Sequence, residues 1–146
     1  MNDTAHTPAP PARGLVVVDA ANVVGSVPDG WWRDRRGAAE RLRDALVPLA
    51  AAGLPAGAGV PQWAGAGPVD VVLVVEGAAR GVAEVPGVRV VSATGSGDDL
   101  IVDIVADARS DTPPRPCLVT TADRELRQRV QRLGADVVGP RAVRPR

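Results

Sequence analysis

Acidic residues recur where apolar segments of this chain end. Each of four such segments is followed, at once or after a short loop, by a carboxylate, and these are Asp19, Glu76, the pair Asp98 and Asp99, and Asp123. Carboxylates that converge on one place repel one another and cannot all stay ionised without compensation. A hard divalent cation with oxygen ligands, Mg²⁺ or Mn²⁺, would provide that compensation.

Asp19 is the acid that most needs a compensating charge. It ends the apolar run "LVVVD" at residues 15–19, where loss of hydration penalises a charge. A bound cation would neutralise it. Asn22 follows three positions later. It is expected either to hydrogen-bond and orient a ligand carboxylate or to make an Asx-turn in its own loop.

Simple structural roles compete with ligand roles for the other acids. Ser96 with Asp99, and Thr120 with Asp123, have the spacing of capping boxes at helix starts. Glu76, at a strand end, could simply be solvated. The coincidence of these acids at the ends of four segments is what favours a metal site over the separate structural roles.

The acids at positions 99, 103 and 107 recur every fourth residue and share one face of a predicted helix. A solvated acidic face is the ordinary explanation for such a stripe. Asp103, one turn into the helix, is the member of the stripe beyond Asp99 that could still reach a site at the start of the helix.

Strand-like and helix-like segments alternate along the chain and would position these acids. Strands are predicted at residues 15–18, 69–75, 87–91, 117–121 and 135–139, and helices at 34–52, 98–108 and 123–134. Apolar strands joined by helices predict a parallel sheet covered on both faces, and right-handed crossovers limit it to a doubly wound α/β sandwich. The carboxyl ends of such strands share one edge, where the acids are expected to meet.

The remaining segments are predicted to be irregular. Residues 53–68 form a Gly/Pro-rich loop, residues 1–13 a disordered leader, and residues 139–146 a loose basic tail. Pro48 predicts an early end or a kink in the first helix, and Gly134 the end of the last one.

Composition narrows the classes of function. The 146 residues are enough for one domain with a real core, and a formal net charge of zero gives no overall field that favours nucleic acid. The only histidine is His6, in the leader, so histidine-based catalysis is not expected. The only cysteine, Cys117, excludes an internal disulfide and a cysteine zinc site, and is expected to pack. Without a signal core or a membrane-spanning apolar run, a cytoplasmic protein without membrane contact is expected.

Three motifs resemble the YacP-like proteins of the NYN branch of the PIN-like superfamily. The segment "VVVDAANVVG" has their Asp-x-x-Asn-hydrophobic-hydrophobic-Gly pattern, and an Asp-Arg pair starts the next helix. "SGDDLIVD" resembles their Asp-Asp-x-Ile segment, and "LVTTADREL" their Thr-Ser-Asp-Arg strand end. Two positions depart from the pattern: Ala21 stands where an aromatic residue usually precedes the Asn, and Glu76 where a turn with Asp usually follows the second strand.

The resemblance implies a PIN-like three-layer α/β/α sandwich with a mostly parallel five-stranded sheet in the order 3-2-1-4-5. It implies a nuclease domain at residues 14–143, between the leader and a tail at residues 144–146. The implied activity is Mg²⁺- or Mn²⁺-dependent endoribonuclease action on phosphodiester bonds of single-stranded RNA. Some relatives act on mRNA at the ribosome, which makes ribosome-associated mRNA a candidate partner.

The shared sheet edge and the resemblance together assign the site. Asp19, Asp98 and Asp123 are the expected catalytic residues and main metal ligands, with Asp99 and Asp103 as further ligands. Asn22 and Thr121 are expected to support the ligands from a second layer.

A neutral chain needs a local basic surface to hold RNA. The segment "WWRDRR" at residues 31–36 offers Trp32 to stack on unpaired bases and Arg35 to pair with phosphate, and Arg124 is a second phosphate contact at the metal edge. The structural alternative is that one of the two tryptophans packs at the start of the helix and the other arginines are solvated or paired.

Two other functions remain open. One is a non-catalytic PIN-like module that binds RNA or protein. The other is a metal-dependent hydrolase of a nucleotide or small phosphate ester, whose chemistry would be the same.

Overall fold

The computed structural model describes residues 13–57 and 59–144. Residues 1–12, which include His6 and nearly all of the expected leader, lie outside the described residues, as do residues 145–146 of the expected tail. None of the helices in the described part is long and apolar enough to cross a membrane.

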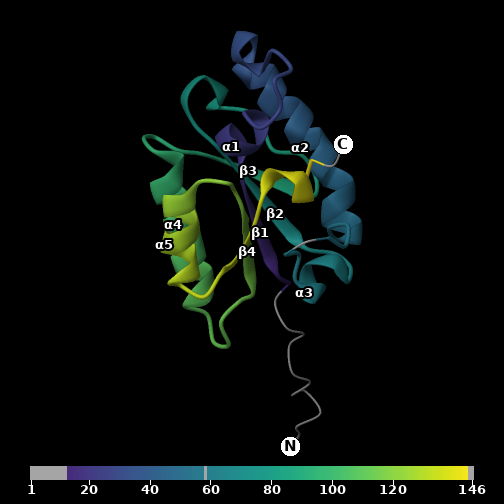
Figure 1. Ribbon diagram of the computed structural model, residues 1–146, viewed down its shortest axis with the longest axis vertical. Helices are drawn as coiled ribbons and strands as arrows, with labels where there is room; N and C mark the ends of the chain where they lie inside the picture. Colours follow the sequence, from purple (N-terminus) through teal and green to yellow (C-terminus); the bar gives the residue numbers. More distant parts are fainter. Residues whose placement is uncertain (1–12, 58, 145–146) are drawn as a thin grey trace, which may run out of the picture.

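A five-stranded parallel sheet forms the centre of the molecule (Figure 1), in the order β3-β2-β1-β4-β5. The expected sheet and strand order are confirmed, and each strand lies within one or two residues of its predicted position. The strands are β1 (Leu15–Asp19), β2 (Asp70–Val75), β3 (Val88–Ser92), β4 (Cys117–Thr120) and β5 (Asp136–Val138). Every residue of β1 is buried, as expected for a strand covered on both faces.

Helices cover both faces of the sheet and complete three layers (Figure 1). The longest helix, α2 (Arg35–Ala52), lies on one face with two short helices, α1 (Ala20–Val24) and α3 (Gln62–Gly65). The other face carries α4 (Gly97–Arg109) and α5 (Arg124–Gln131). Alternate residues of β1 serve the two cores, because successive side chains of a strand point to opposite faces.

Each core is built almost entirely from aliphatic side chains. Val16 and Val18 of β1 pack in the cluster that contains Leu42 and Leu46 of α2. Val17 packs in the other cluster, with Ile101 and Val105 of α4 and Leu126 of α5. This double burial explains why the strand segments are continuous apolar runs.

Several local predictions were wrong. The chain forms α1 directly after Asp19, where no helix was expected, and α3 interrupts the loop expected at residues 53–68. Pro48 does not end α2 early: its side chain is exposed, while Leu46 and Ala50 are buried on the packed face, so burial holds the helix together as far as Ala52.

The last described residues are packed rather than loose. After the short 3-10 helix η4 (Pro140–Ala142), Val143 is buried in the core. Arg144 donates a hydrogen bond to the Val23 carbonyl at 3.4 Å and forms an ion pair with Asp29 at 2.6 Å. The prediction of a loose tail over residues 139–146 is therefore wrong as far as residue 144, because an apolar side chain anchors the segment.

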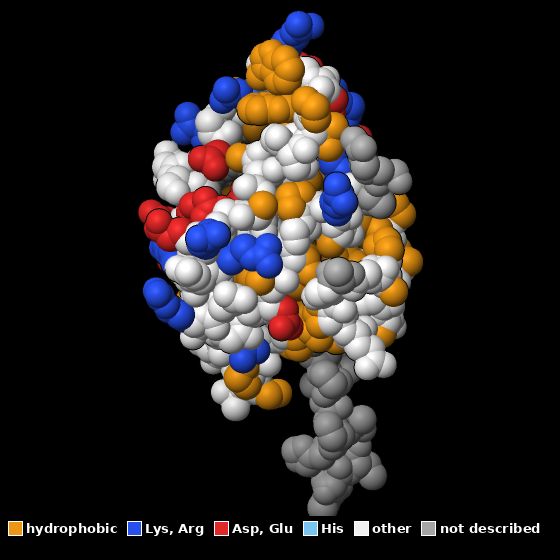
Figure 2. All heavy atoms as spheres, viewed as in Figure 1, with side chains coloured by type: hydrophobic (Ala, Val, Ile, Leu, Met, Phe, Trp, Pro, Cys, Tyr) orange, Lys and Arg blue, Asp and Glu red, His pale blue; other side chains and the backbone are white. Residues whose placement is uncertain are grey.

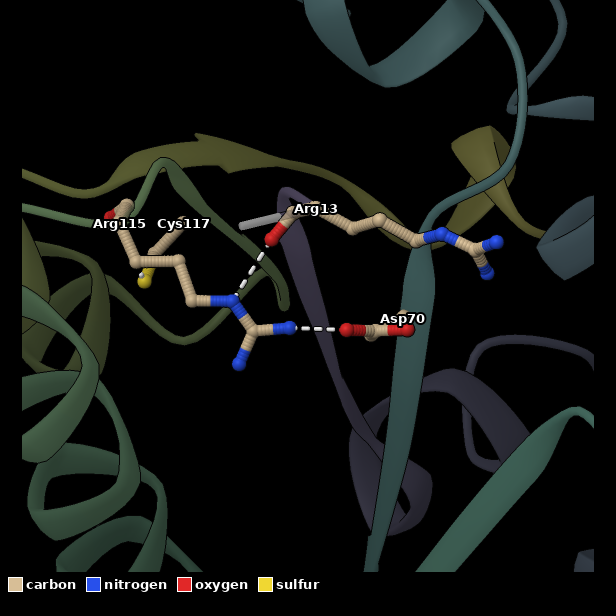
Figure 3. A network of polar contacts seen from close by, with 4 residues as sticks. All are labelled: Arg13, Asp70, Arg115 and Cys117. Carbon is tan, nitrogen blue, oxygen red and sulfur yellow. Dashed lines mark hydrogen bonds and ion pairs between the residues drawn. The ribbon is translucent and has the colours of Figure 1, made fainter. Parts of the chain in front are cut away.

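A polar network ties together the amino-terminal edge of the sheet (Figure 3). Arg115, just before β4, donates from Nε to the Arg13 carbonyl at 2.7 Å and pairs with the Asp70 carboxylate at the start of β2. The Cys117 thiol donates to the Arg115 carbonyl at 3.4 Å, and burial raises the pKa of this thiol. Cys117 is thus an inert packed residue, as expected.

Candidate active site

Asp19 is a buried carboxylate at the carboxyl end of the central strand. Its side chain is 5% exposed, and it lies beside Val74 of β2 in the sheet register. One carboxylate oxygen accepts the Thr121 hydroxyl at 3.0 Å, and the other accepts the Asn22 backbone N–H at 3.4 Å. Both donors are neutral, and no ion pair to Asp19 is formed by any residue in the described ranges.

Burial raises the pKa of Asp19 to about 6. The hydrogen bonds from Thr121 and Asn22 lower this pKa in part, whereas the charges of Asp98 and Glu76 raise it further. Near neutral pH the fold therefore holds an ionised carboxylate in a place that disfavours its charge. That is the electrostatic condition in which a cation from outside the chain is bound favourably.

Two bridges hold Asp19 and α1 against the loop after β4. The buried Thr121 hydroxyl donates to Asp19 and also accepts the Asp123 backbone N–H at 3.1 Å. The Asn22 side-chain oxygen accepts the Ala122 backbone N–H at 2.8 Å. Asn22 thus contacts Asp19 through its backbone only, and its side chain spans to another segment instead of closing an Asx-turn.

Asp98 lies in the first turn of α4 and is half-buried. Ser96 caps this helix, accepting the Asp98 backbone N–H at 3.1 Å, so the expected cap is present. Burial raises the pKa of Asp98, as do the charges of Asp123, Glu76 and Asp99 in decreasing order, while Arg129 lowers it. Carboxylates that follow β2 and β4 therefore act electrostatically on Asp98, as expected for acids that share one edge of the sheet.

Glu76 was expected either to join the acids at this edge or simply to be solvated, and it lies within this group of acids. It follows β2 directly, is half-buried, and its charge acts on both Asp19 and Asp98. A Cβ atom on Gly97 would lie 2.7 Å from a Glu76 carboxylate oxygen, so glycine at this position makes room for it. The available sequence signal was its position directly after a strand, the same signal that singled out Asp19.

Asp123 acts differently from the predicted capping box. It is itself the N-cap of α5, with one carboxylate oxygen accepting the Leu126 backbone N–H at 2.8 Å. Thr120 is not the cap, because it is still part of the buried strand and its hydroxyl has no hydrogen-bond partner among the described residues. The other Asp123 carboxylate oxygen accepts no hydrogen bond from a described residue, and the charge of Asp123 contributes to the raised pKa of Asp98.

Asp99 and Asp103 lie toward the solvent side of α4. Asp99 forms an ion pair with Arg129 of α5 at 3.0 Å, and acidic side chains beside arginines are visible on this flank of the molecule (Figure 2). Asp103 is exposed one turn farther along the helix, where it borders a surface hollow beside residues 92–96. The structure does not bring Asp103 to Asp19, and its role as a ligand stays a prediction.

The donors of this edge suit a hard cation, although the side chains as placed do not enclose one. The acids supply only oxygen, the ligand type that Mg²⁺ and Mn²⁺ prefer. In residues 13–57 and 59–144, no three His, Cys, Asp or Glu side chains are arranged to hold a metal ion. The acids instead interact in pairs, through the charges that raise the pKa values of Asp19 and Asp98.

The two tryptophans before α2 have different surroundings. Trp31, in the 3-10 helix η2 (Trp31–Arg33), is half-buried and packs against the core, with the Arg35 guanidinium 5.5 Å from its ring centre. Trp32 is 52% exposed, with the Arg33 guanidinium 5.9 Å from its ring. One tryptophan therefore packs at the start of the helix, and Trp32 is the open one. Arg35 is exposed at the first position of α2.

Arg124 begins α5 and is exposed. It borders a surface hollow with Ala122 and Arg127. Arg127 is engaged in the fold, since it donates to the Thr121 carbonyl at 3.0 Å. Arg124 is thus the member of this pair whose side chain is available to a ligand, next to the N-cap Asp123.

The chain has the fold of a solved YacP structure. A crystal structure of a mutant form of Rae1 (YacP) from Bacillus subtilis superposes with a TM-score of 0.62 over 89% of this chain and 72% of that chain, at 16% sequence identity. No protein-family model matches the chain, and no curated protein matches it. The likeness to YacP proteins expected from the three motifs is thus confirmed for the fold, an α/β/α sandwich with strand order β3-β2-β1-β4-β5.

Proposed function

We propose that residues 14–143 form a divalent-cation-dependent endoribonuclease that hydrolyses phosphodiester bonds of single-stranded RNA. The observation that carries the proposal is the buried Asp19, which has no ion-pair partner among the described residues and whose pKa is raised mainly by burial and further by the charges of Asp98 and Glu76. Asp98 is coupled in turn to Asp123. Carboxylates from the ends of β1, β2 and β4 and from the start of α4 thus act on one another at the edge where parallel sheets bind ligands.

Mg²⁺ or Mn²⁺ would be held by Asp19, Asp98 and the Asp123 oxygen that does not cap α5, with Asp99 as a further candidate ligand. Glu76 is added to these candidates because it lies directly after β2, within the same group of acids. Such a cation supplies, when bound, a water of lowered pKa and stabilisation of the leaving oxygen. The chain itself orients these acids: Thr121 fixes Asp19 and the start of the Asp123 turn with one hydroxyl.

Binding of RNA would depend on exposed cations near this edge, because the chain as a whole is neutral. Arg35 and Arg124 would pair with phosphates, and the exposed Trp32 would stack on an unpaired base, which requires a single-stranded substrate. Ribosome-associated mRNA belongs to the proposal through the YacP-like resemblance alone.

The test is cleavage of a single-stranded RNA in Mn²⁺ by the wild type and by Asp19→Asn. A metal ligand contributes several kcal/mol to the transition state, so the rate should fall by at least about 100-fold. Asp107→Asn is the matched control, because Asp107 is an exposed aspartate on α4 whose side chain has no polar contact with described residues. Wild-type activity in Asp19→Asn would refute the proposal.

The non-catalytic module is the second candidate. Asp123 uses one oxygen as a helix cap and Asp99 is paired with Arg129, and both contacts compete with metal binding. A binding module would show no Mn²⁺-induced rise in melting temperature, whereas the nuclease should show one that Asp19→Asn abolishes. Parallel assays on nucleotides would reveal a hydrolase of small phosphate esters.

A further inference from the structure

A cavity of about 300 Å³ lies beside the acidic edge, between α1, the start of α2 and the 3-10 helix η3 (Gly77–Ala79) that follows β2. Small side chains such as Ala21 and Ala39 line it, together with Trp31, Arg35 and Glu76. Its volume is at the lower limit of the usual range for small-molecule pockets, which suits one nucleotide and not a longer segment.

The lining is mostly apolar and includes one cation. Trp31 is held by its packing against the core, and the Arg35 guanidinium lies over its ring, 5.5 Å from the ring centre. Alanine side chains leave open the space that larger residues would fill. The exposed Arg35 side chain can leave the ring of Trp31 to a flat nucleobase, which stacks there in its place, and the guanidinium can then pair with the adjoining phosphate.

Glu76 joins this cavity to the acidic edge. It lines the cavity, and its charge also acts on Asp19 and Asp98. No described residue donates a hydrogen bond to its carboxylate, so Glu76 can accept one from the N–H groups on the edge of a nucleobase. A base in the cavity would therefore hold its own nucleotide next to the proposed site of cleavage.

We infer that this cavity binds one unpaired nucleobase of the RNA substrate, stacked on Trp31, with an adjoining phosphate on Arg35. The inference rests on the proposed function for the identity of the ligand. It adds Trp31 to Trp32 as a stacking residue, in the cavity that Glu76 also lines.

A binding experiment tests the inference independently of cleavage. A single-stranded RNA oligonucleotide is made as a series with one abasic position each, and its affinity for the wild type is measured at low ionic strength in EDTA. Loss of the stacked base should weaken binding about 10-fold at a single position of the series. A flat profile, or no measurable RNA binding, would overturn the inference.

Ala21→Leu is the matched variant, because Ala21 is exposed at the cavity and the larger side chain fills it without entering the core. The abasic profile should become flat in Ala21→Leu and remain unchanged in Ala45→Leu, an exposed alanine of α2 outside the cavity. If one abasic position still weakens the affinity of Ala21→Leu for the RNA, the binding of a base in this cavity is refuted. Failure of the nuclease proposal is separate: it would appear as unchanged cleavage in Asp19→Asn, with the abasic minimum still present.

Discussion

Replacing Asp19 by Asn should stabilise the metal-free protein at neutral pH. Burial raises the pKa of this carboxyl from the ordinary 3.8 to about 6, a difference of about 2. Each pKa unit corresponds to about 1.4 kcal/mol, so ionised Asp19 costs the folded state about 3 kcal/mol above pH 6. Asparagine removes the charge while keeping an oxygen that can accept the Thr121 hydroxyl.

The pH dependence has a defined sign. A carboxyl with a higher pKa in the folded than in the unfolded chain binds more protons when folded. Its contribution to stability is therefore complete below about pH 3.8 and is lost as the pH rises through about 6. The stability of the wild type relative to Asp19→Asn should thus fall by about 3 kcal/mol between these values and stay level above them.

Urea unfolding of both proteins in EDTA, at intervals from pH 4 to pH 8, measures this difference. Asp107→Asn, on the exposed side of α4, controls for the loss of one negative charge away from Asp19. Thr121→Val should move the transition to higher pH, since the Thr121 hydroxyl lowers the Asp19 pKa. A free-energy difference between wild type and Asp19→Asn that does not change with pH would refute the assignment of Asp19 as a destabilised buried charge.

Three further outcomes are expected. Mn²⁺ at about 100 times its dissociation constant should stabilise the wild type by about 2.7 kcal/mol, and calorimetry should show no such gain for Asp19→Asn. Gly97→Ala should weaken Mn²⁺ binding with little loss of stability, since a methyl group there meets a Glu76 carboxylate oxygen at 2.7 Å and displaces this flexible side chain; equal Mn²⁺ affinity by titration calorimetry would argue against Glu76 at the site. The double change Arg35→Ala and Arg124→Ala should reduce the slope of log affinity for RNA against log salt by about 1.4, for two lost phosphate contacts; an unchanged slope would exclude these arginines from the binding surface.

The sequence alone determined the sheet and the edge at which the acids meet. Short continuous apolar runs bounded by turn residues favour strands buried on both faces, and the helices predicted between most of them favour parallel pairing. Parallel pairing then sends the ends of all strands to one edge, so the order of residues along the chain was enough to group Asp19, Asp98 and Asp123. The strand order was predicted from the likeness of the motifs to YacP proteins, and the superposition on a solved YacP structure confirms that likeness for the fold.

Tertiary structure decided how the acids are arranged at that edge and which tryptophan lines the cavity beside them. Gly97 leaves room for the Glu76 carboxylate, and α4 carries Asp103 one turn farther from the strand ends than Asp99. Trp31 rather than Trp32 faces the cavity beside Glu76. The spacing of residues along the chain cannot reveal these arrangements, because each depends on how two elements that are distant in the sequence pack against each other.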